Sequence, residues 1–127
     1  MKLKILFVDD DLLMHQLYRP HLERAGYEVF DAMDGAEVFG VAFREIPNVV
    51  VMDMLMPGTD GTTCIIRIKE AESTRRIPII AISGDGYFHC LHKVLSDLGV
   101  ECFLSKPFSP AKLVSEIRRV DKDQKPA

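Results

Sequence analysis

The sequence predicts an α/β fold in which a five-stranded parallel sheet carries helices on both faces. Apolar runs of strand length, such as Leu3–Val8 and Ile77–Ile82, alternate along the chain with segments whose apolar residues recur at helical spacing. These runs are apolar almost throughout, which is typical of strands buried on both faces of a parallel sheet. Right-handed crossovers between such strands place helices on both faces.

Five segments are expected to form the strands. They are 3–8, 27–30, 49–52, 77–82 and 102–104. The second is the weakest, and it follows Gly26, which is a typical residue at the end of a helix. The last is short but has the same apolar character as the others.

Five amphipathic patterns predict the helices that follow these strands. Their apolar positions are Met14, Tyr18, Leu22 and Ala25; Val38, Ala42 and Ile46; Ile65 and Ile68; Leu91, Val94, Leu95 and Leu98; and Leu113, Ile117 and Val120. Asp34 and Glu37 have capping-box spacing at the start of the second helix. Ser109 and Pro110 suit the N-cap and first position of the fifth. We therefore expect one domain over residues 1–120 and a polar C-terminal tail over residues 121–127.

Length and charge narrow the class of protein. The chain has 127 residues and a net charge of −3, so we expect a single domain without the basic surface that direct nucleic-acid binding needs. Its three cysteines have no paired spacing and suit a reducing compartment. We find neither a signal-peptide pattern nor an apolar run long enough to cross a membrane, and we expect a cytoplasmic protein.

Polar residues stand where the predicted strands end. The first strand is followed by Asp9, Asp10 and Asp11, the third by Asp53, the fourth by Ser83 and the fifth by Lys106. The carboxyl ends of parallel strands share one edge of the sheet, which is where such folds bind their ligands. We therefore expect these side chains to converge.

The chemistry of such a cluster suggests a metal ion and a phosphoryl group. Several carboxylates close together repel each other unless a cation is present, and Mg²⁺ suits a site of carboxylates, water and phosphate oxygens. The cation, Lys106 and the Ser83 hydroxyl would neutralise the phosphoryl oxygens while Asp53 attacks in line. Asp11 is also a good candidate for the N-cap of the first helix.

Four motifs in this order resemble the receiver domains of response regulators. They are Ile5–Asp11 (ILFVDDD), Val51–Gly61 (VMDMLMPGTDG), Ala81–Gly84 (AISG) and Leu104–Phe108 (LSKPF). The resemblance extends from Leu3 to about Val120. It implies a flavodoxin-like doubly wound sheet of order 2-1-3-4-5. It also implies a phosphoacceptor domain of a two-component system or phosphorelay, served by a histidine kinase or phosphotransfer protein.

The resemblance also implies a role for individual residues. Asp53 would be the phosphoacceptor, and Mg²⁺ would be bound by Asp10, Asp53 and the backbone carbonyl of Leu55, with Asp9 acting through water. Lys106 would pair with the phosphoryl group, and the Lys106–Pro107 bond is expected to be cis. Ser83 and Phe103 would form the switch pair. The domain would catalyse its own phosphorylation and slow hydrolysis without being a turnover enzyme.

Phosphorylation is expected to change the face formed by the fourth helix, the fifth strand and the fifth helix, and so its affinity for a downstream protein or an output domain. We assign His89, His92, Lys93, Glu101, Arg118 and Arg119 to this face. Some receivers dimerise there through two adjacent acids, but this chain has Glu101 followed by Cys102. We therefore expect a monomer or a weak dimer. Leu55 and Asp85 would border the path of attacking water, and Leu55 favours slow dephosphorylation.

Three other interpretations fit the sequence less well. A pseudo-receiver that only binds partners is disfavoured by the complete acidic set. A flavin or nucleotide binder is disfavoured because no glycine-rich phosphate loop follows the first strand. His89, Cys90 and His92 suggest zinc, but four ligands would be needed and no partner cluster is apparent.

Overall fold

The computed structural model describes residues 2–56, 58–84 and 87–123. Its main sheet has five parallel strands in the order β2-β1-β3-β6-β7. They are β1 (Lys4–Val8), β2 (Glu28–Ala32), β3 (Val49–Asp53), β6 (Ile79–Ser83) and β7 (Val100–Ser105). Counted among themselves these strands have the order 2-1-3-4-5, so the predicted flavodoxin-like topology is confirmed.

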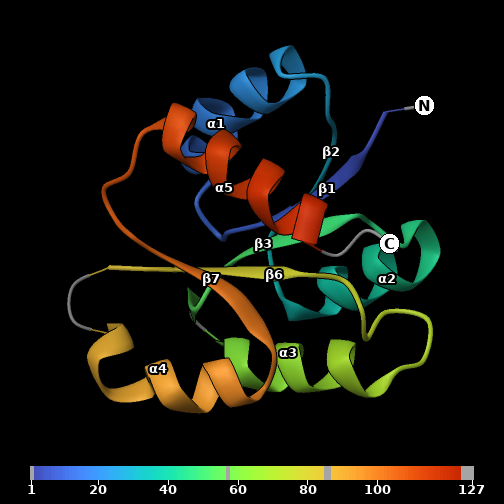
Figure 1. Ribbon diagram of the computed structural model, residues 1–127, viewed down its shortest axis with the longest axis vertical. Helices are drawn as coiled ribbons and strands as arrows, with labels where there is room; N and C mark the ends of the chain where they lie inside the picture. The colour runs from blue at the N-terminus through green and yellow to red at the C-terminus, as the bar shows by residue number, and fades with distance from the viewer. Residues whose placement is uncertain (1, 57, 85–86, 124–127) are drawn as a thin grey trace.

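Five helices cover the two faces of this sheet (Figure 1). They are α1 (Leu12–Arg24), α2 (Gly35–Glu45), α3 (Gly61–Glu70), α4 (Tyr87–Asp97) and α5 (Pro110–Asp123). Helices α1 and α5 pack on one face, and α2, α3 and α4 on the other. None of the helices in the described part of the chain is both long and apolar enough to span a bilayer.

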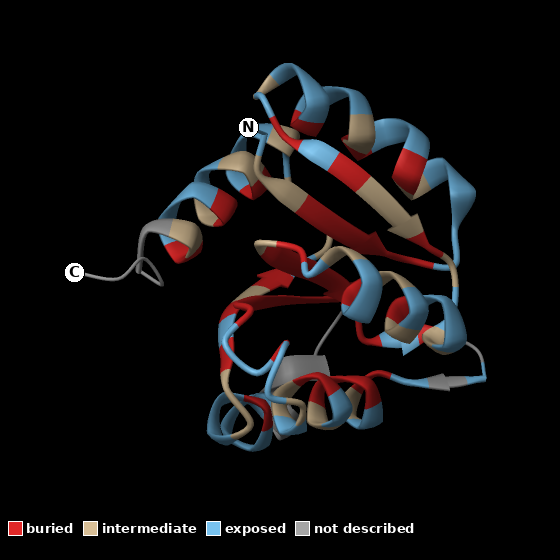
Figure 2. Cartoon of the chain, turned by 90° about the vertical axis from the view of Figure 1, so that its right-hand side faces the viewer, coloured by how far each residue is buried: buried red, intermediate tan, exposed pale blue. Residues whose placement is uncertain are grey.

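The sheet separates two apolar cores because successive residues of a strand point to opposite faces. In β1, Leu6 and Val8 pack with residues of α2 and α3, whereas Ile5 and Phe7 pack with residues of α1 and α5. All five residues of β3 are buried, as expected for the central strand of such a sheet. Figure 2 shows these buried strands between half-exposed helices.

The helix starts follow the predicted capping chemistry. Asp11 accepts a hydrogen bond from the backbone N–H of Leu13, and Asp34 accepts one from Glu37. The Ser109 hydroxyl oxygen accepts from the backbone N–H of Lys112. These bonds satisfy donors that the first turn of a helix leaves without partners. Asp11 is therefore the cap of α1, as the sequence suggested.

Two features differ from the expected outline. A short antiparallel hairpin, β4 (Leu55–Met56) with β5 (Thr59–Asp60), lies between β3 and α3. Helix α5 continues to Asp123 and so takes up the first part of the predicted polar tail, while residues 124–127 lie outside the described residues. The division of the chain at residue 120 stays a prediction.

Candidate functional site

Three carboxylates meet at the carboxyl ends of the two central strands. Asp9 and Asp10 follow β1, Asp53 ends β3, and β1 pairs with β3. One oxygen of each carboxylate lies within 4.8 Å of the others. Asp9 and Asp53 are buried, whereas Asp10 is exposed. The predicted convergence of these acids is thus present in the structure.

Lys106 follows the edge strand β7, and its side chain reaches this cluster across β6. Its Nζ lies 3.1 Å from Oδ2 of Asp53 and 3.6 Å from Oδ2 of Asp9. The backbone fixes this position, because the Lys106 N–H donates to the carbonyl oxygen of Ser83 at 2.8 Å. The Lys106–Pro107 peptide bond is cis, as predicted. Lys106 therefore offers a single cation to two buried carboxylates.

Burial and neighbouring charge shift the protonation of these groups. Burial raises the pKa of Asp9 and the charge of Asp53 adds to this, although the Asp11 N–H and Lys106 act in the opposite direction. Burial lowers the pKa of Lys106, but its bonds and charge interactions with Asp53 and Asp9 outweigh burial and raise it overall. Lys106 is thus held in its charged form beside Asp9, a carboxyl group whose ionisation is disfavoured by burial.

Two buried oxygens at this site have no hydrogen-bond partner among the described residues. They are Oδ2 of Asp9 and Oγ of Ser83. Ser83 ends β6, and β6 is the neighbour of β3 on the side opposite β1. A buried polar atom without a partner is destabilising, so a ligand that bonds to these oxygens would remove that penalty. The all-oxygen donor set and the incompletely neutralised charge fit a hard cation such as Mg²⁺.

The backbone after Asp53 turns back over the carboxylate. The N–H of Leu55 donates to Oδ1 of Asp53 at 2.9 Å, and the Leu55 side chain is 54% exposed beside the site. Gly61 packs closely against the residue after Asp53, because a Cβ there would lie 3.2 Å from the backbone Cα of Met54. Asp85 and Pro57, which the sequence also associated with this site, lie outside the described residues.

The predicted switch pair occupies adjacent strands. Phe103 lies in β7 opposite Ala81, and Ser83 lies two residues further along β6. The Phe103 ring is half-buried and contacts the His92 ring of α4, with the ring centroids 4.1 Å apart. The contact with His92 was not foreseen, and it links Phe103 directly to α4.

His15 is a buried residue of α1 that no sequence pattern singled out. Its Nε2 lies 2.7 Å from the carbonyl oxygen of Asp9, and its Nδ1 lies 2.8 Å from Oδ1 of Asp31 in β2. The neighbouring positions Met14 and Tyr18 carry the apolar periodicity of this helix, and no local pattern marks a buried histidine between them. Only the pairing of β2 with β1 brings its partners into reach.

The family model described as the response regulator receiver domain matches residues 5–118. The chain belongs to this family. It is 34% identical over 119 residues to the response regulator PleD of Caulobacter vibrioides, covering 93% of this chain and 26% of PleD. It is 33% identical over 116 residues to the phosphate regulon regulator PhoB of Pseudomonas aeruginosa, covering 91% of this chain and 50% of PhoB. The chain thus spans between about a quarter and a half of these relatives.

Solved receiver structures agree with this assignment. A putative response regulator from Chloroflexus aurantiacus superposes with a TM-score of 0.87 at 29% identity, covering 96% of this receiver and 99% of that chain. The receiver domain of the sensor histidine kinase PA1611 from Pseudomonas aeruginosa superposes with a TM-score of 0.85 at 27% identity, covering 96% and 99%. Its structure has a magnesium ion coordinated in the active site cleft. The receiver described here has a cluster of three acids, Asp9, Asp10 and Asp53, that could hold a metal ion.

Proposed function

We propose that this receiver accepts a phosphoryl group on Asp53 from a phosphohistidine of a histidine kinase or phosphotransfer protein. The observation that carries the proposal is the position of Lys106 between Asp9 and Asp53, beside two buried oxygens that have no hydrogen-bond partner in the described part of the chain. An oxygen of Asp53 bonds to phosphorus as the bond from phosphorus to the donor imidazole nitrogen breaks, and the nitrogen keeps the bonding electron pair.

The residues around Asp53 have separate tasks in this reaction. Lys106, already charged, pairs with a phosphoryl oxygen, and the Ser83 hydroxyl donates to another. Asp10, Asp53 and the carbonyl of Leu55 would hold Mg²⁺, with Asp9 acting through a water. The bound ion would neutralise charge that develops on the phosphoryl oxygens. The exposed position of Asp10 leaves the site open to a donor protein.

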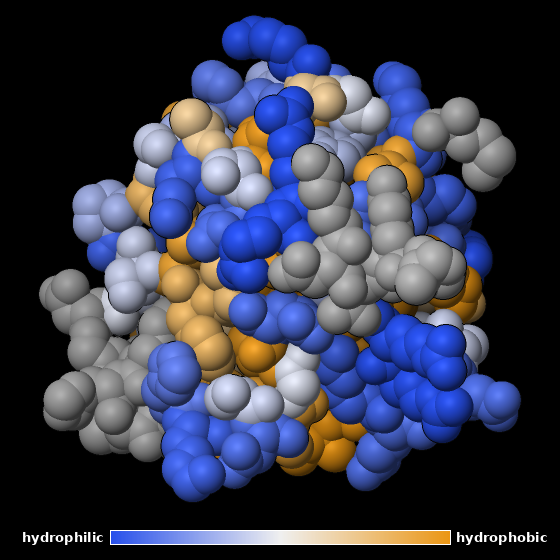
Figure 3. Space-filling model, viewed as in Figure 1, coloured by the Kyte–Doolittle hydropathy of each residue, from blue (hydrophilic) through white to orange (hydrophobic). Residues whose placement is uncertain are grey.

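The surface that responds is proposed to be the side formed by α4, β7 and α5. Drawing the Ser83 hydroxyl toward the phosphoryl group would free space for Phe103 to turn inward, which would break its contact with His92. Lys93 and Glu101 are exposed on these elements, and Figure 3 shows hydrophilic side chains interspersed with separate apolar areas on this side. Arg118 lies beside Tyr27, and both Arg118 and Arg119 line a groove with His21 of α1. We therefore leave Arg118 out of the proposed responsive side.

The proposed responsive side of α4, β7 and α5 suggests which partners this receiver would bind. We propose that activation changes the affinity for another protein or for an output domain of a longer chain, and that the receiver itself does not contact nucleic acid. Transcriptional regulators such as PhoB are among its relatives. In a protein of that kind, we propose that an output domain outside this chain would contact the nucleic acid. The receiver alone would be a monomer or a weak dimer.

The proposal is tested by incubating the protein with acetyl phosphate or phosphoramidate and Mg²⁺ and measuring the intact mass. We expect one phosphoryl adduct that is absent in Asp53→Asn and in the presence of a chelator. Asp97→Asn, which changes an exposed acid of α4, is the matched control and should be phosphorylated normally. An adduct formed to the wild-type level in Asp53→Asn would disprove the assignment.

A further inference from the structure

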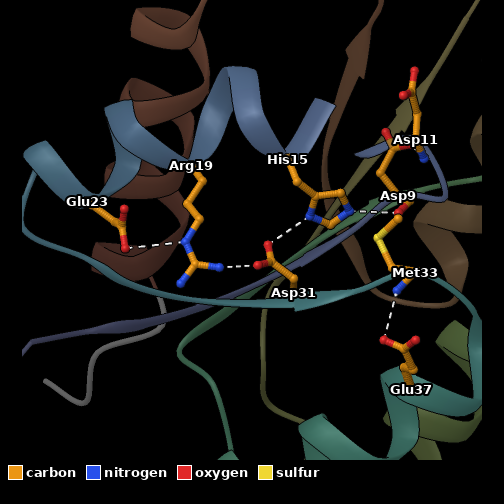
Figure 4. Close-up of polar contacts among 8 residues, drawn as sticks. All are labelled: Asp9, Asp11, His15, Arg19, Glu23, Asp31, Met33 and Glu37. Carbon is orange, nitrogen blue, oxygen red and sulfur yellow. Dashed lines mark hydrogen bonds and ion pairs between the residues drawn. The ribbon is translucent and has the colours of Figure 1, made fainter. Parts of the chain in front are cut away.

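His15 is a buried polar residue that the proposed phosphorylation chemistry does not use. Its side chain is 4% exposed, and its ring packs edge-on against Phe7, with the centroids 5.0 Å apart. Figure 4 shows the ring between two acceptors, the Asp9 carbonyl oxygen 2.7 Å from Nε2 and the Asp31 carboxylate 2.8 Å from Nδ1. Both ring nitrogens therefore have a partner.

On the Nδ1 side of the His15 ring, Asp31 belongs to a chain of charged groups. Asp31 in β2 pairs with Arg19 of α1 through its other carboxylate oxygen, and Arg19 also pairs with Glu23 at 3.3 Å (Figure 4). The Asp9 carbonyl oxygen can only accept, so Nε2 donates to it, while Nδ1 faces the Asp31 carboxylate. The imidazole is thus held between the β2 edge of the sheet and the end of β1.

The carbonyl that His15 contacts belongs to the peptide that joins Asp9 to Asp10. The direction of this carbonyl sets the peptide plane from which the Asp10 side chain leaves the backbone. On the other side of Asp9, its N–H donates to the carbonyl oxygen of Ala32 at 3.1 Å. The Asp9 side chain is held as well, because its Oδ1 accepts from the Asp11 N–H at 2.9 Å. His15 completes the support of this segment.

We propose that His15 is a positioning residue of the cation site, holding the Asp9–Asp10 peptide so that Asp10 is presented to the metal. The inference rests on the proposed function, because it assumes that the acidic cluster binds a divalent cation. His15 itself contacts neither the cation nor the phosphoryl group and acts only through its bond to the Asp9 carbonyl. Partners behind metal ligands commonly influence affinity by about 10- to 100-fold.

Two neutral substitutions separate this role from a general packing role. The side-chain amide nitrogen of His15→Gln falls near the place of Nε2 and can still donate to the Asp9 carbonyl. The amide nitrogen of His15→Asn falls near the place of Nδ1 and can donate only toward Asp31. Because both remove the ring and any ring charge, their difference reports on the carbonyl bond. Thermal unfolding without metal controls for stability.

The test measures binding of Mn²⁺, used in place of Mg²⁺, by electron paramagnetic resonance. We expect His15→Asn to bind Mn²⁺ about tenfold more weakly than His15→Gln, the lower end of the usual range for such supporting residues. The ¹³C resonance of the Asp9 carbonyl should shift in His15→Asn and stay near the wild-type position in His15→Gln. A merely structural role would change the unfolding temperature of both variants without separating their affinities.

A second matched pair applies if His15→Asn does not fold. Asp31→Ala and Asp31→Asn both remove the charge at a half-buried position, and only Asn keeps an acceptor for Nδ1. Asp31→Ala should bind Mn²⁺ more weakly than Asp31→Asn. Equal affinities within both pairs, alongside normal binding in the wild type, would overturn the role of His15 alone. A wild-type protein that binds no Mn²⁺ would overturn the proposed function and this inference together.

Discussion

The Nζ atom of Lys106 lies 3.1 Å from Oδ2 of Asp53, although 53 residues separate the two in the sequence. The pair joins the central strand β3 to the outermost strand β7. Lys106 compensates two buried carboxylates, and under the proposed function the same cation would already be in place for the phosphoryl group.

Lys106→Ala should impair the response of the protein to phosphorylation, or to the phosphoryl mimic beryllofluoride, while leaving the fold intact. A charge-assisted hydrogen bond contributes about 1.5–3 kcal/mol, so beryllofluoride with Mg²⁺ should bind about 10- to 100-fold more weakly. Titration followed by NMR measures this. Lys112→Ala, which changes an exposed lysine of α5, is the control. A normal titration in Lys106→Ala would show that its role has been misassigned.

Ser83→Ala should separate stability from function. Because the Ser83 hydroxyl is buried without a partner among the described residues, removing it should leave the free energy of unfolding unchanged or raise it by roughly 1 kcal/mol. The same change should weaken beryllofluoride binding. Chemical denaturation and NMR titration give the two quantities. Ser105→Ala, opposite Ser83 on β7, should not weaken binding, and equal losses in both variants would count against the role of Ser83.

Leu55→Asn should shorten the lifetime of the phosphoprotein. The exposed Leu55 side chain beside Asp53 has no group that could hydrogen-bond an attacking water, whereas asparagine has one. Decay of the intact-mass adduct after removal of the donor measures the effect. Leu17→Asn, at a similarly exposed site of α1, controls for polarity. Decay that is unchanged or slower in Leu55→Asn would contradict the explanation.

The activated protein should remain a monomer or a weak dimer. Cys102 occupies the position where a second acid would complete a charge network between copies, and it is buried, with Sγ 3.6 Å from Oε1 of Glu116. Surface ion pairs contribute only about 0–1 kcal/mol each, so an incomplete set gives little association. Light scattering with and without beryllofluoride and Mg²⁺ tests this. A tight dimer at micromolar concentration, centred on α4, β7 and α5, is the result that would refute it.

Glu116 should contribute a small stability term that depends on pH. Its hydrogen bond from Arg119 lowers its pKa below the ordinary value of 4.5. The folded protein therefore binds this proton less readily than the unfolded chain, and the stabilisation is present above about pH 4.5 and is lost at lower pH. At neutral pH Glu116→Gln should cost no more than about 1 kcal/mol of unfolding free energy.

Denaturation curves of the wild type and Glu116→Gln across the acidic range measure the difference between them. The difference should shrink as the pH falls below about 4.5. Arg119→Gln removes the main partner and should reduce the same pH-dependent difference, while Lys112, with Nζ 3.7 Å from Oε1 of Glu116, remains. A difference between wild type and Glu116→Gln that stays constant down to low pH would exclude this ion pair as its source.

The fold and the cluster of acids were predictable because both depend on patterns that are local in the sequence. Strands β1, β3 and β6 are almost continuous apolar runs; Asp53 follows one of them directly, and Lys106 follows the shorter run Cys102–Leu104 after Ser105. The hairpin of β4 and β5 was not predictable, since two-residue strands have no periodicity to detect.

Residues whose environment depends on tertiary contacts were less predictable. His15 is buried because Asp31 and the Asp9 carbonyl reach it from two strands, and no feature of the α1 sequence reveals this. Arg118 and Arg119 are adjacent on an exposed helix, yet Arg118 lies beside Tyr27 and Arg119 pairs with Glu116. Arg118 is therefore turned toward a residue that is distant in the sequence, whereas the partner of Arg119 lies three residues earlier on the same helix.

The proposed phosphorylation site is assembled from four places in the chain, near residues 9, 53, 83 and 106, which meet when β1, β3, β6 and β7 are in their native order. A sheet that lacks β7 or has another strand order would not place Lys106 beside Asp53. The extent to which a small phosphodonor labels Asp53 would consequently be proportional to the fraction of natively folded molecules. The initial rate of labelling during refolding could then report the formation of the complete sheet, in a chain that has no tryptophan for fluorescence.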